Sequence, residues 1–320
     1  MIVLWVCLFL AGVAVIVWGA ETFAEHLGTA SVQLGVSTFA LALLLAGAEP
    51  EELATVIAAA LKGAPGIALG DAIGANVAIC LVALGVGAIV APLSFHGAVM
   101  RYAAFGLPIG AAAAWIAWDG EVTRGQGALL VGLYVLYVAV IWIVERRPPM
   151  LGEAGEIEEA REELAKGGKA PRRVGRELML VLAGVIAMAV GGWLLVESVM
   201  RVTGIEATQT KLGLTLVGFA TAFELVVLAW STSRRGASEA AVAGVVGSFA
   251  YNMTMTLGAG ALVHPLEIGD SSLLRGPLLL MLGALALPIL LALPSGYLSR
   301  RSGAMLLTAY MGFVAFVLLT

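Results

Sequence analysis

Apolar runs of about twenty residues recur from Ile2 to Leu319, and they constrain the fold more than any other feature of the chain. A helix needs roughly 20 mostly apolar residues to cross about 30 Å of hydrocarbon. Hydrophobic residues make up 60% of the chain, charged residues make up 12%, and the mean hydropathy is +0.98. This composition is typical of an integral membrane protein and not of a soluble domain of the same length.

We therefore predict an all-α, polytopic membrane protein with about ten transmembrane helices. The two cysteines, Cys7 and Cys80, fall inside predicted spans, where they are expected to pack as small apolar residues. The predicted spans cover residues 2–20, 33–61, 66–91, 97–118, 124–144, 178–200, 211–233, 238–263, 271–294 and 302–319.

A charged segment from Glu145 to Glu177 divides the chain nearly in half. It contains eight acidic and eight basic residues. A segment of this composition is expected to be a solvated tether or a short surface helix, with calcium binding by its acidic run as the alternative. We therefore predict a first five-helix repeat over residues 1–144, a cytoplasmic linker over 145–177, and a second five-helix repeat over 178–320.

The two halves carry an internal repeat. The segment Leu84–Leu93 aligns without gaps on Leu257–Leu266, at an offset of 173 residues. An offset of 172 pairs Glu52 with Glu224. Because each half has an odd number of spans, the second half must enter the membrane from the opposite side, so the repeat is inverted. Inverted repeats permit two packings, each open to one side of the membrane, although a duplicated scaffold without transport is the alternative.

Loop charges predict the orientation. With the N-terminus outside, the cytoplasmic loops contain thirteen Lys and Arg residues and the external loops contain five. The positive-inside rule then favours both termini outside, in a plasma (inner) membrane.

Three carboxylates and a proline interrupt the apolar second span, in the order Glu49-Pro50-Glu51-Glu52. A charge at the centre of a bilayer costs about 2.5–3.5 kcal/mol on insertion scales, so a ligand or water must compensate for it. The proline removes a backbone donor and breaks the helix, which frees carbonyl oxygens that can line a cavity.

Further oxygen-bearing side chains lie in the third, seventh and eighth spans, within Gly70–Asn76, Gly218–Leu225 and Gly244–Asn252. Calcium prefers six to eight oxygen ligands, so two facing glutamates with amides, hydroxyls and freed carbonyls suit a divalent cation. The candidate ligands are Glu49, Glu51, Glu52, Asp71, Asn76, Thr221, Glu224, Ser248 and Asn252.

These segments resemble the cation/calcium exchanger superfamily, which includes the sodium/calcium exchangers. The resemblance rests on Gly47–Leu53 and Phe219–Leu225, on basic-glycine turns near Lys62 and Arg234, and on the glycine-rich segments of the third and eighth spans. It implies ten spans, Glu52 and Glu224 as central ligands, and exchange of calcium or a similar divalent cation for sodium by alternating access.

The chain also departs from the superfamily pattern. The superfamily motif usually has hydroxyl-bearing residues at two positions in each half. In this chain those positions are occupied by Ala48 and Glu49 in the first half, and by Ala220 and Thr221 in the second. Carboxylates that are desolvated together readily exchange a proton for a cation, so proton-coupled antiport is the main alternative to sodium coupling.

Other functional classes are less favoured. An uncoupled cation channel or sensor would share the acidic site, whereas an intramembrane aspartyl protease would need a second aspartate in a span, and Asp119 and Asp270 lie in predicted loops. No ATP-binding G-x-x-x-x-G-K-S/T motif is present, so an ion gradient is the expected energy source. We expect no enzymatic activity and no cofactor. The expected partners are the lipid bilayer and cations, with no nucleic acid and no obligate protein partner.

Overall fold

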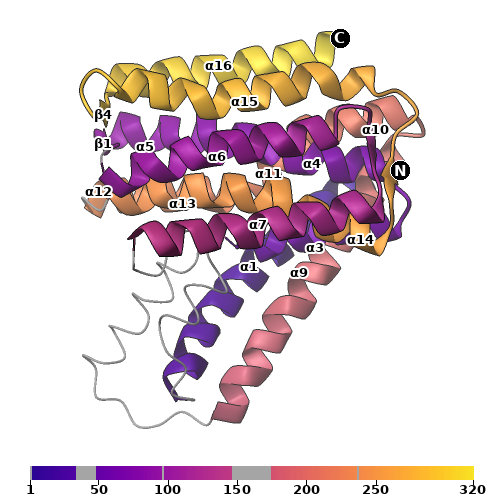
Figure 1. The fold of residues 1–320 in the computed structure, drawn as a ribbon. Helices are drawn as coiled ribbons and strands as arrows, with labels where there is room; N and C mark the ends of the chain where they lie inside the picture. Colours follow the sequence, from indigo (N-terminus) through magenta and orange to yellow (C-terminus); the bar gives the residue numbers. More distant parts are fainter. Residues whose placement is uncertain (1, 34–47, 96, 146–173, 236–237) are drawn as a thin grey trace.

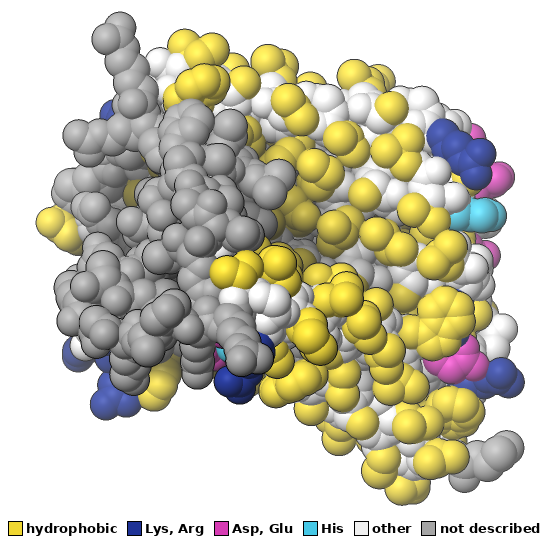
Figure 2. Space-filling view, turned by 90° about the horizontal axis from the view of Figure 1, so that it is seen from below, with side chains coloured by type: hydrophobic (Ala, Val, Ile, Leu, Met, Phe, Trp, Pro, Cys, Tyr) yellow, Lys and Arg dark blue, Asp and Glu magenta, His cyan; other side chains and the backbone are white. Residues whose placement is uncertain are grey.

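The computed structural model describes residues 2–33, 48–95, 97–145, 174–235 and 238–320, and helices dominate all of these ranges. Eight of the described helical stretches are long and apolar enough to cross a membrane. Hydrophobic side chains cover much of the face in Figure 2, and charged side chains gather near its edge. The predicted fold class, an all-α polytopic membrane protein, is confirmed.

The first half consists of helices with two very short strands. Its elements are α1 (Ile2–Gln33), α3 (Pro50–Leu61), α4 (Pro65–Ala78), the π-helix η1 (Ile79–Ala83), α5 (Leu84–Val90), β1 (Leu93–Ser94), α6 (Gly97–Ile116), β2 (Glu121–Val122) and α7 (Arg124–Glu145).

The second half has the same general plan. Its elements are α9 (Val174–Val202), α10 (Glu206–Leu212), the π-helix η2 (Gly213–Val217), α11 (Gly218–Thr221), α12 (Phe223–Arg235), α13 (Ser238–Tyr251), the π-helix η3 (Asn252–Thr256), α14 (Leu257–Val263), β3 (Leu266–Glu267), α15 (Ser272–Ala292), β4 (Tyr297–Leu298) and α16 (Arg300–Leu319).

The first helix is longer than the sequence predicts. The predicted span ends at residue 20, but α1 continues to Gln33 because no proline interrupts it and it packs along α9. Residues 34–47 of the second predicted span, 33–61, lie outside the described part of the chain, as does most of the predicted linker. The eighth predicted span matches the continuous helical stretch formed by α13, η3 and α14.

The internal repeat reappears in the element boundaries. From α4 to β1 and from α13 to β3, every helix, π-helix and strand begins at an offset of 173 residues. In Figure 1, α5 lies at the left end of the bundle and the equivalent α14 lies at the right end. The two equivalent segments therefore run in opposite directions, as the odd number of predicted spans requires.

Two antiparallel strand pairs connect the halves at opposite ends of the bundle. Strand β1 pairs with β4, with Leu93 opposite Leu298, and β2 pairs with β3, with Val122 opposite Leu266. Each pair contains one strand from each half. All four of these leucine and valine side chains are fully buried, so the pairs also close the apolar core at each end.

Helices α1 and α9 pack closely along two reciprocal glycine contacts. A Cβ atom at Gly12 would lie 2.9 Å from the Gly191 carbonyl oxygen, and one at Gly19 would lie 2.8 Å from that of Gly184. Small residues let helix backbones approach in this way, and in membranes such packing replaces the hydrophobic effect as the driving force. Gly12 and Gly184 are repeat equivalents at an offset of 172, as are Gly19 and Gly191, so the contact is symmetric.

We expect Gly19→Ala to destabilise the protein and Gly132→Ala not to. The added methyl group at Gly19 must displace the α9 backbone, which costs about 1–3 kcal/mol in overpacking, whereas a Cβ at Gly132 meets no atom within 4 Å. Thermal unfolding in detergent measures the difference. Equal unfolding midpoints for the two variants would contradict the close α1–α9 contact.

Candidate functional site

The acidic segment lies at the start of a helix, and residues 34–47, where the sequence predicts the first part of the broken span, lie outside the described part of the chain. Glu49 has non-helical backbone angles of φ −123° and ψ 84°, and α3 begins at Pro50. Glu51 and Glu52 occupy the first turn of α3, where the positive end of the helix dipole favours negative charge. All three glutamates are at most 3% exposed.

Two hydrogen bonds join acidic residues of the first half to hydroxyl groups of the second. The Ser248 hydroxyl donates to Glu49, and the Thr221 hydroxyl donates to Asp71 Oδ1 at 2.9 Å. Glu49 and Thr221 are equivalent at an offset of 172. The residue at this repeat position therefore forms a hydrogen bond to the opposite half in each case. The structure therefore brings together four predicted site residues at the boundary between the halves.

A chain of amide and hydroxyl groups crosses the same boundary. Asn252 Nδ2 donates to Asn76 Oδ1 at 3.4 Å, and Asn76 Nδ2 donates to the Phe249 carbonyl at 3.2 Å. Thr256 donates in turn to Asn252 Oδ1 at 3.4 Å. All three side chains are fully buried. Each asparagine thus has a hydrogen-bonded position, and each side-chain oxygen keeps a second lone pair for a ligand.

The π-helices were not predicted from the sequence. Asn252 begins η3, and Asn76 lies three residues before η1. Wider π-turns often occur at functional sites, because they shift side chains and backbone oxygens out of the regular helical positions. Thr254 and Thr256 lie within η3, and the four-residue spacing of Asn252 and Thr256 was the available signal that these two polar side chains share a helix face.

Glu52 is the most isolated carboxylate in the described residues. It is 1% exposed, and neither of its oxygens has a hydrogen-bond partner among the described residues. Asp71 and Glu51 lie close enough to interact with its charge. Asp71 is fully buried, and its Oδ2 atom has no hydrogen-bond partner in the same ranges. A buried carboxylate without compensation is costly, so these oxygens suit a cation.

Glu224 lies in a different environment from its equivalent. It occupies the first turn of α12 and is partly buried, with its Oε2 atom shielded from solvent. The preceding helix, α11, ends at Thr221, and only Ala222 separates it from α12. Across the described residues, no group of three or more acidic, histidine or cysteine side chains is placed to hold a metal ion. Amide, hydroxyl and backbone oxygens would have to complete any cation site.

A surface hollow of the described structure has no acidic residue in its lining. Its volume is about 340 Å³, and apolar side chains of α4, η1, α15 and α16 line it, including Leu81, Leu287 and Phe316. The candidate site is therefore a buried polar interface and not a pocket for an organic ligand.

The family model described as sodium/calcium exchanger protein matches residues 4–143 and 177–319. The chain belongs to this family. The resemblance in its acidic and glycine-rich segments is thereby confirmed. Members of the exchanger family are integral membrane transporters of cations, which agrees with the helical fold and with a site made of oxygen-bearing side chains.

Several curated relatives match the exchanger over nearly its whole length. The inner membrane protein YrbG of Escherichia coli (strain K12) is 24% identical over 316 residues, which cover 96% of this chain and 95% of that protein. The sodium/calcium exchanger MaX1 of Methanosarcina acetivorans is 24% identical over 345 residues, covering 96% of both chains. The putative antiporter CaxA of Alkalimonas amylolytica is 23% identical, covering 95% of both.

A solved structure shares the fold of this exchanger. It is that of the sodium-calcium exchanger NCX_Mj, soaked with sodium and strontium ions, and it has a TM-score of 0.61 at 22% identity. The match covers 98% of this chain and 99% of that one. At this identity the likeness establishes the fold alone.

We expect Thr221→Val to destabilise the exchanger more than Thr221→Ser. Valine has nearly the volume of threonine but cannot donate to Asp71, and an unsatisfied buried acceptor costs about 1–3 kcal/mol. Serine keeps the hydroxyl group. Thermal unfolding in detergent, without added divalent ions, measures both variants. If serine and valine lowered the midpoint equally, lost packing and not the lost hydrogen bond would account for the change.

Proposed function

We propose that this chain is a secondary active antiporter that exchanges calcium, or a similar divalent cation, for sodium across a membrane. The buried, uncompensated carboxylate of Glu52 is the observation that carries this proposal. In the proposal, Glu52 and Glu224 are the central ligands, and the oxygens of Glu49, Glu51, Asp71, Asn76, Thr221, Ser248 and Asn252 complete or support the site.

The chemistry of these groups favours a hard divalent cation. Calcium takes six to eight oxygen ligands in a flexible geometry, including carboxylates, amide oxygens and backbone carbonyls. The break that the sequence predicts at Pro50 would supply backbone oxygens beside three acidic side chains. A doubly charged ion would offset the electrostatic cost of placing several carboxylates in one buried region.

Alternating access is supported by the difference between the two halves. The acidic helix α3 of the first half packs against α9 of the second half, and Thr55 of α3 is fully buried. The repeat equivalent of Thr55 in α12 is Val227, which is 47% exposed. Helix α3 is thus covered by the opposite half, whereas in the described residues α12 is not covered in the same way by α1. Exchange of these two arrangements between the halves would move the access route from one side of the membrane to the other.

Proton coupling is a second candidate, and a specific observation favours it. Glu49, Glu51 and Asp71 are three further buried acids, and Glu49 occupies a position where the superfamily motif usually has a hydroxyl group. Acidic groups that are buried together can share protons that leave when a cation binds. The counter-ion is therefore the main question for the transport experiment.

We expect calcium uptake into proteoliposomes when sodium is loaded inside, and little uptake with equal sodium on both sides. Glu52→Gln and Glu224→Gln should each abolish it, because a neutral amide cannot balance the charge of the ion. Glu267→Gln, at an exposed position in β3, is the matched control and should retain uptake.

A parallel experiment with a proton gradient separates the alternatives. If only a proton gradient drives calcium uptake, the counter-ion is the proton and not sodium. Passive calcium flux without any gradient dependence would indicate a channel. Absence of flux for calcium, strontium and manganese under both gradients would overturn the antiporter proposal.

We also propose that both termini face the outside of a plasma (inner) membrane. The two chain ends lie at the same end of the bundle in Figure 1. Arg234 and Arg235 end α12, and Arg300 and Arg301 begin α16, at the opposite end. The predicted loops on that side contain thirteen Lys and Arg residues, eight of them in the charged linker, against five on the other side, and this difference favours the cytoplasm.

In a Cys7→Ala background, a membrane-impermeant maleimide should label Glu267→Cys in intact cells. It should label Arg301→Cys only after the membrane is opened. Both positions are exposed in the structure. Labelling should therefore depend only on whether the reagent can reach the side of the membrane on which each cysteine lies. The reverse labelling pattern would invert the orientation.

A further inference from the structure

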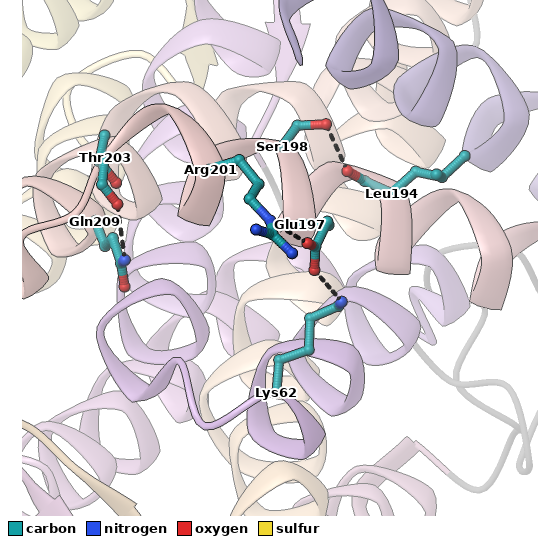
Figure 3. A network of polar contacts seen from close by, with 7 residues as sticks. All are labelled: Lys62, Leu194, Glu197, Ser198, Arg201, Thr203 and Gln209. Atoms are coloured by element: carbon teal, nitrogen blue, oxygen red, sulfur yellow. Dashed lines mark hydrogen bonds and ion pairs between the residues drawn. The ribbon is translucent and has the colours of Figure 1, made fainter. Parts of the chain in front are cut away.

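Helix α9 is connected to the end of α3 by a network of charged side chains (Figure 3). Lys62 caps the C-terminus of α3, and its Nζ lies 2.6 Å from Glu197 Oε2. The Lys62 ammonium also lies 3.5 Å from the centre of the Trp193 ring. Glu197 Oε1 accepts a hydrogen bond from Arg201 Nε at 2.6 Å. The Lys62 side chain is only 7% exposed, so its contact with Glu197 is largely shielded from solvent.

The repeat places an equivalent set of charges at the opposite end of the molecule. The offset of 172 that relates Glu52 to Glu224 also relates Lys62 to Arg234 and Glu25 to Glu197. Glu25 lies on α1, as Glu197 lies on α9, and Arg234 lies in the last turn of α12, as Lys62 caps α3.

This second set is separated in the present arrangement. Glu25 and Arg234 are both exposed, and within the described residues neither forms an ion pair. Arg234 instead lies over the Trp230 ring of its own helix, at 4.8 Å. The equivalent of Trp193 is Glu21, one turn before Glu25 and also exposed. Arg234 would therefore meet two carboxylates on α1 where Lys62 meets one carboxylate and one ring.

The backbone packing shows the same asymmetry. A Cβ atom at Gly192 of α9 would lie 3.1 Å from the Thr55 backbone of α3, so these helices touch. Among the described residues, α1 and α12 have no comparable packing. Because α1 and α9 are held together by their glycine contacts, a movement of α9 away from α3 would carry α1 with it.

We propose that Lys62–Glu197 and Arg234–Glu25 are alternative latches, each of which closes one end of the transporter while the other is open. This inference rests on the proposed alternating access. It assigns a conformational role to four charged residues outside the cation site. In the present structure the first latch is closed, and the second forms when the two halves exchange their arrangements.

Disulfide trapping tests the proposal in membrane vesicles. The background carries Cys7→Ala and Cys80→Ala. One variant adds Lys62→Cys and Glu197→Cys, and the other adds Glu25→Cys and Arg234→Cys. We expect both pairs to form disulfides under mild oxidation, detected as loss of maleimide-polymer labelling on a gel. Conditions that increase one cross-link should decrease the other.

A helix-face control excludes random collision. Phe23 lies two residues before Glu25, and its backbone contacts Gly184 of α9. The pair Phe23→Cys with Arg234→Cys should therefore stay reduced. Cross-linking of this control as fast as that of the Glu25 pair, or no cross-linking of the Glu25 pair under any ion condition, would overturn the proposal.

A charge variant tests the energetic coupling. Lys62→Gln in the Glu25–Arg234 cysteine background should increase the rate of that cross-link by about two- to fivefold, as expected for the loss of one ion pair. Lys62→Arg should preserve the original rate. An unchanged rate with glutamine would show that the first latch does not oppose the second.

The transport assay and the trapping assay fail independently. Cation exchange without an Arg234–Glu25 cross-link would overturn the latch proposal and leave the antiporter proposal intact. Reciprocal cross-linking in a protein that exchanges no cation would support the latches and overturn the antiporter proposal.

Discussion

The burial of carboxylates within a bilayer-sized bundle is the constraint on which the rest of this structure depends. Glu49, Glu51 and Glu52 are almost completely buried, and they lie at the start of α3. Hydroxyl groups of the opposite half offset part of the cost of burying acidic groups here, because Ser248 donates to Glu49 and Thr221 donates to the buried Asp71. Glu52 has no such protein partner in the described residues. The halves therefore supply one another with polar contacts, and neither half forms the acidic region alone.

The sequence was informative about the fold because the lipid environment restricts the solutions. Long apolar runs predicted helices, and the offset shared by Leu84–Leu93 and Leu257–Leu266 predicted the repeat that reappears in the boundaries of α4 to β1 and α13 to β3. The predicted length of α1 was wrong. Glu21, Glu25 and His26 suggested the end of a span, but charge alone does not end a helix when its neighbour also extends beyond the bundle.

The candidate site was predicted in its residue types and less well in its connections. Proline at position 50 marked the start of α3 directly, because proline is tolerated in the first turn of a helix, where its missing N–H would have no helical partner. The bond between Thr221 and Asp71 could not be inferred, since it depends on how two distant helices are rotated against each other. The π-helices were missed for a similar reason. One extra residue in a helical turn hardly changes the hydropathy pattern of the sequence, although it changes the direction of the Asn252 and Thr256 side chains.

The strand pairs have a consequence for the ancestry of the fold. Strand β1 is equivalent to β3 at an offset of 173, and β2 is equivalent to β4 at an offset of 176. In the observed pairs, β1 is joined to β4, which is the equivalent of β2, and β2 is joined to β3, which is the equivalent of β1. Two copies of a single half, inserted in opposite senses, contain every strand needed to form both pairs again. The architecture is thus that of a dual-topology homodimer joined into one polypeptide.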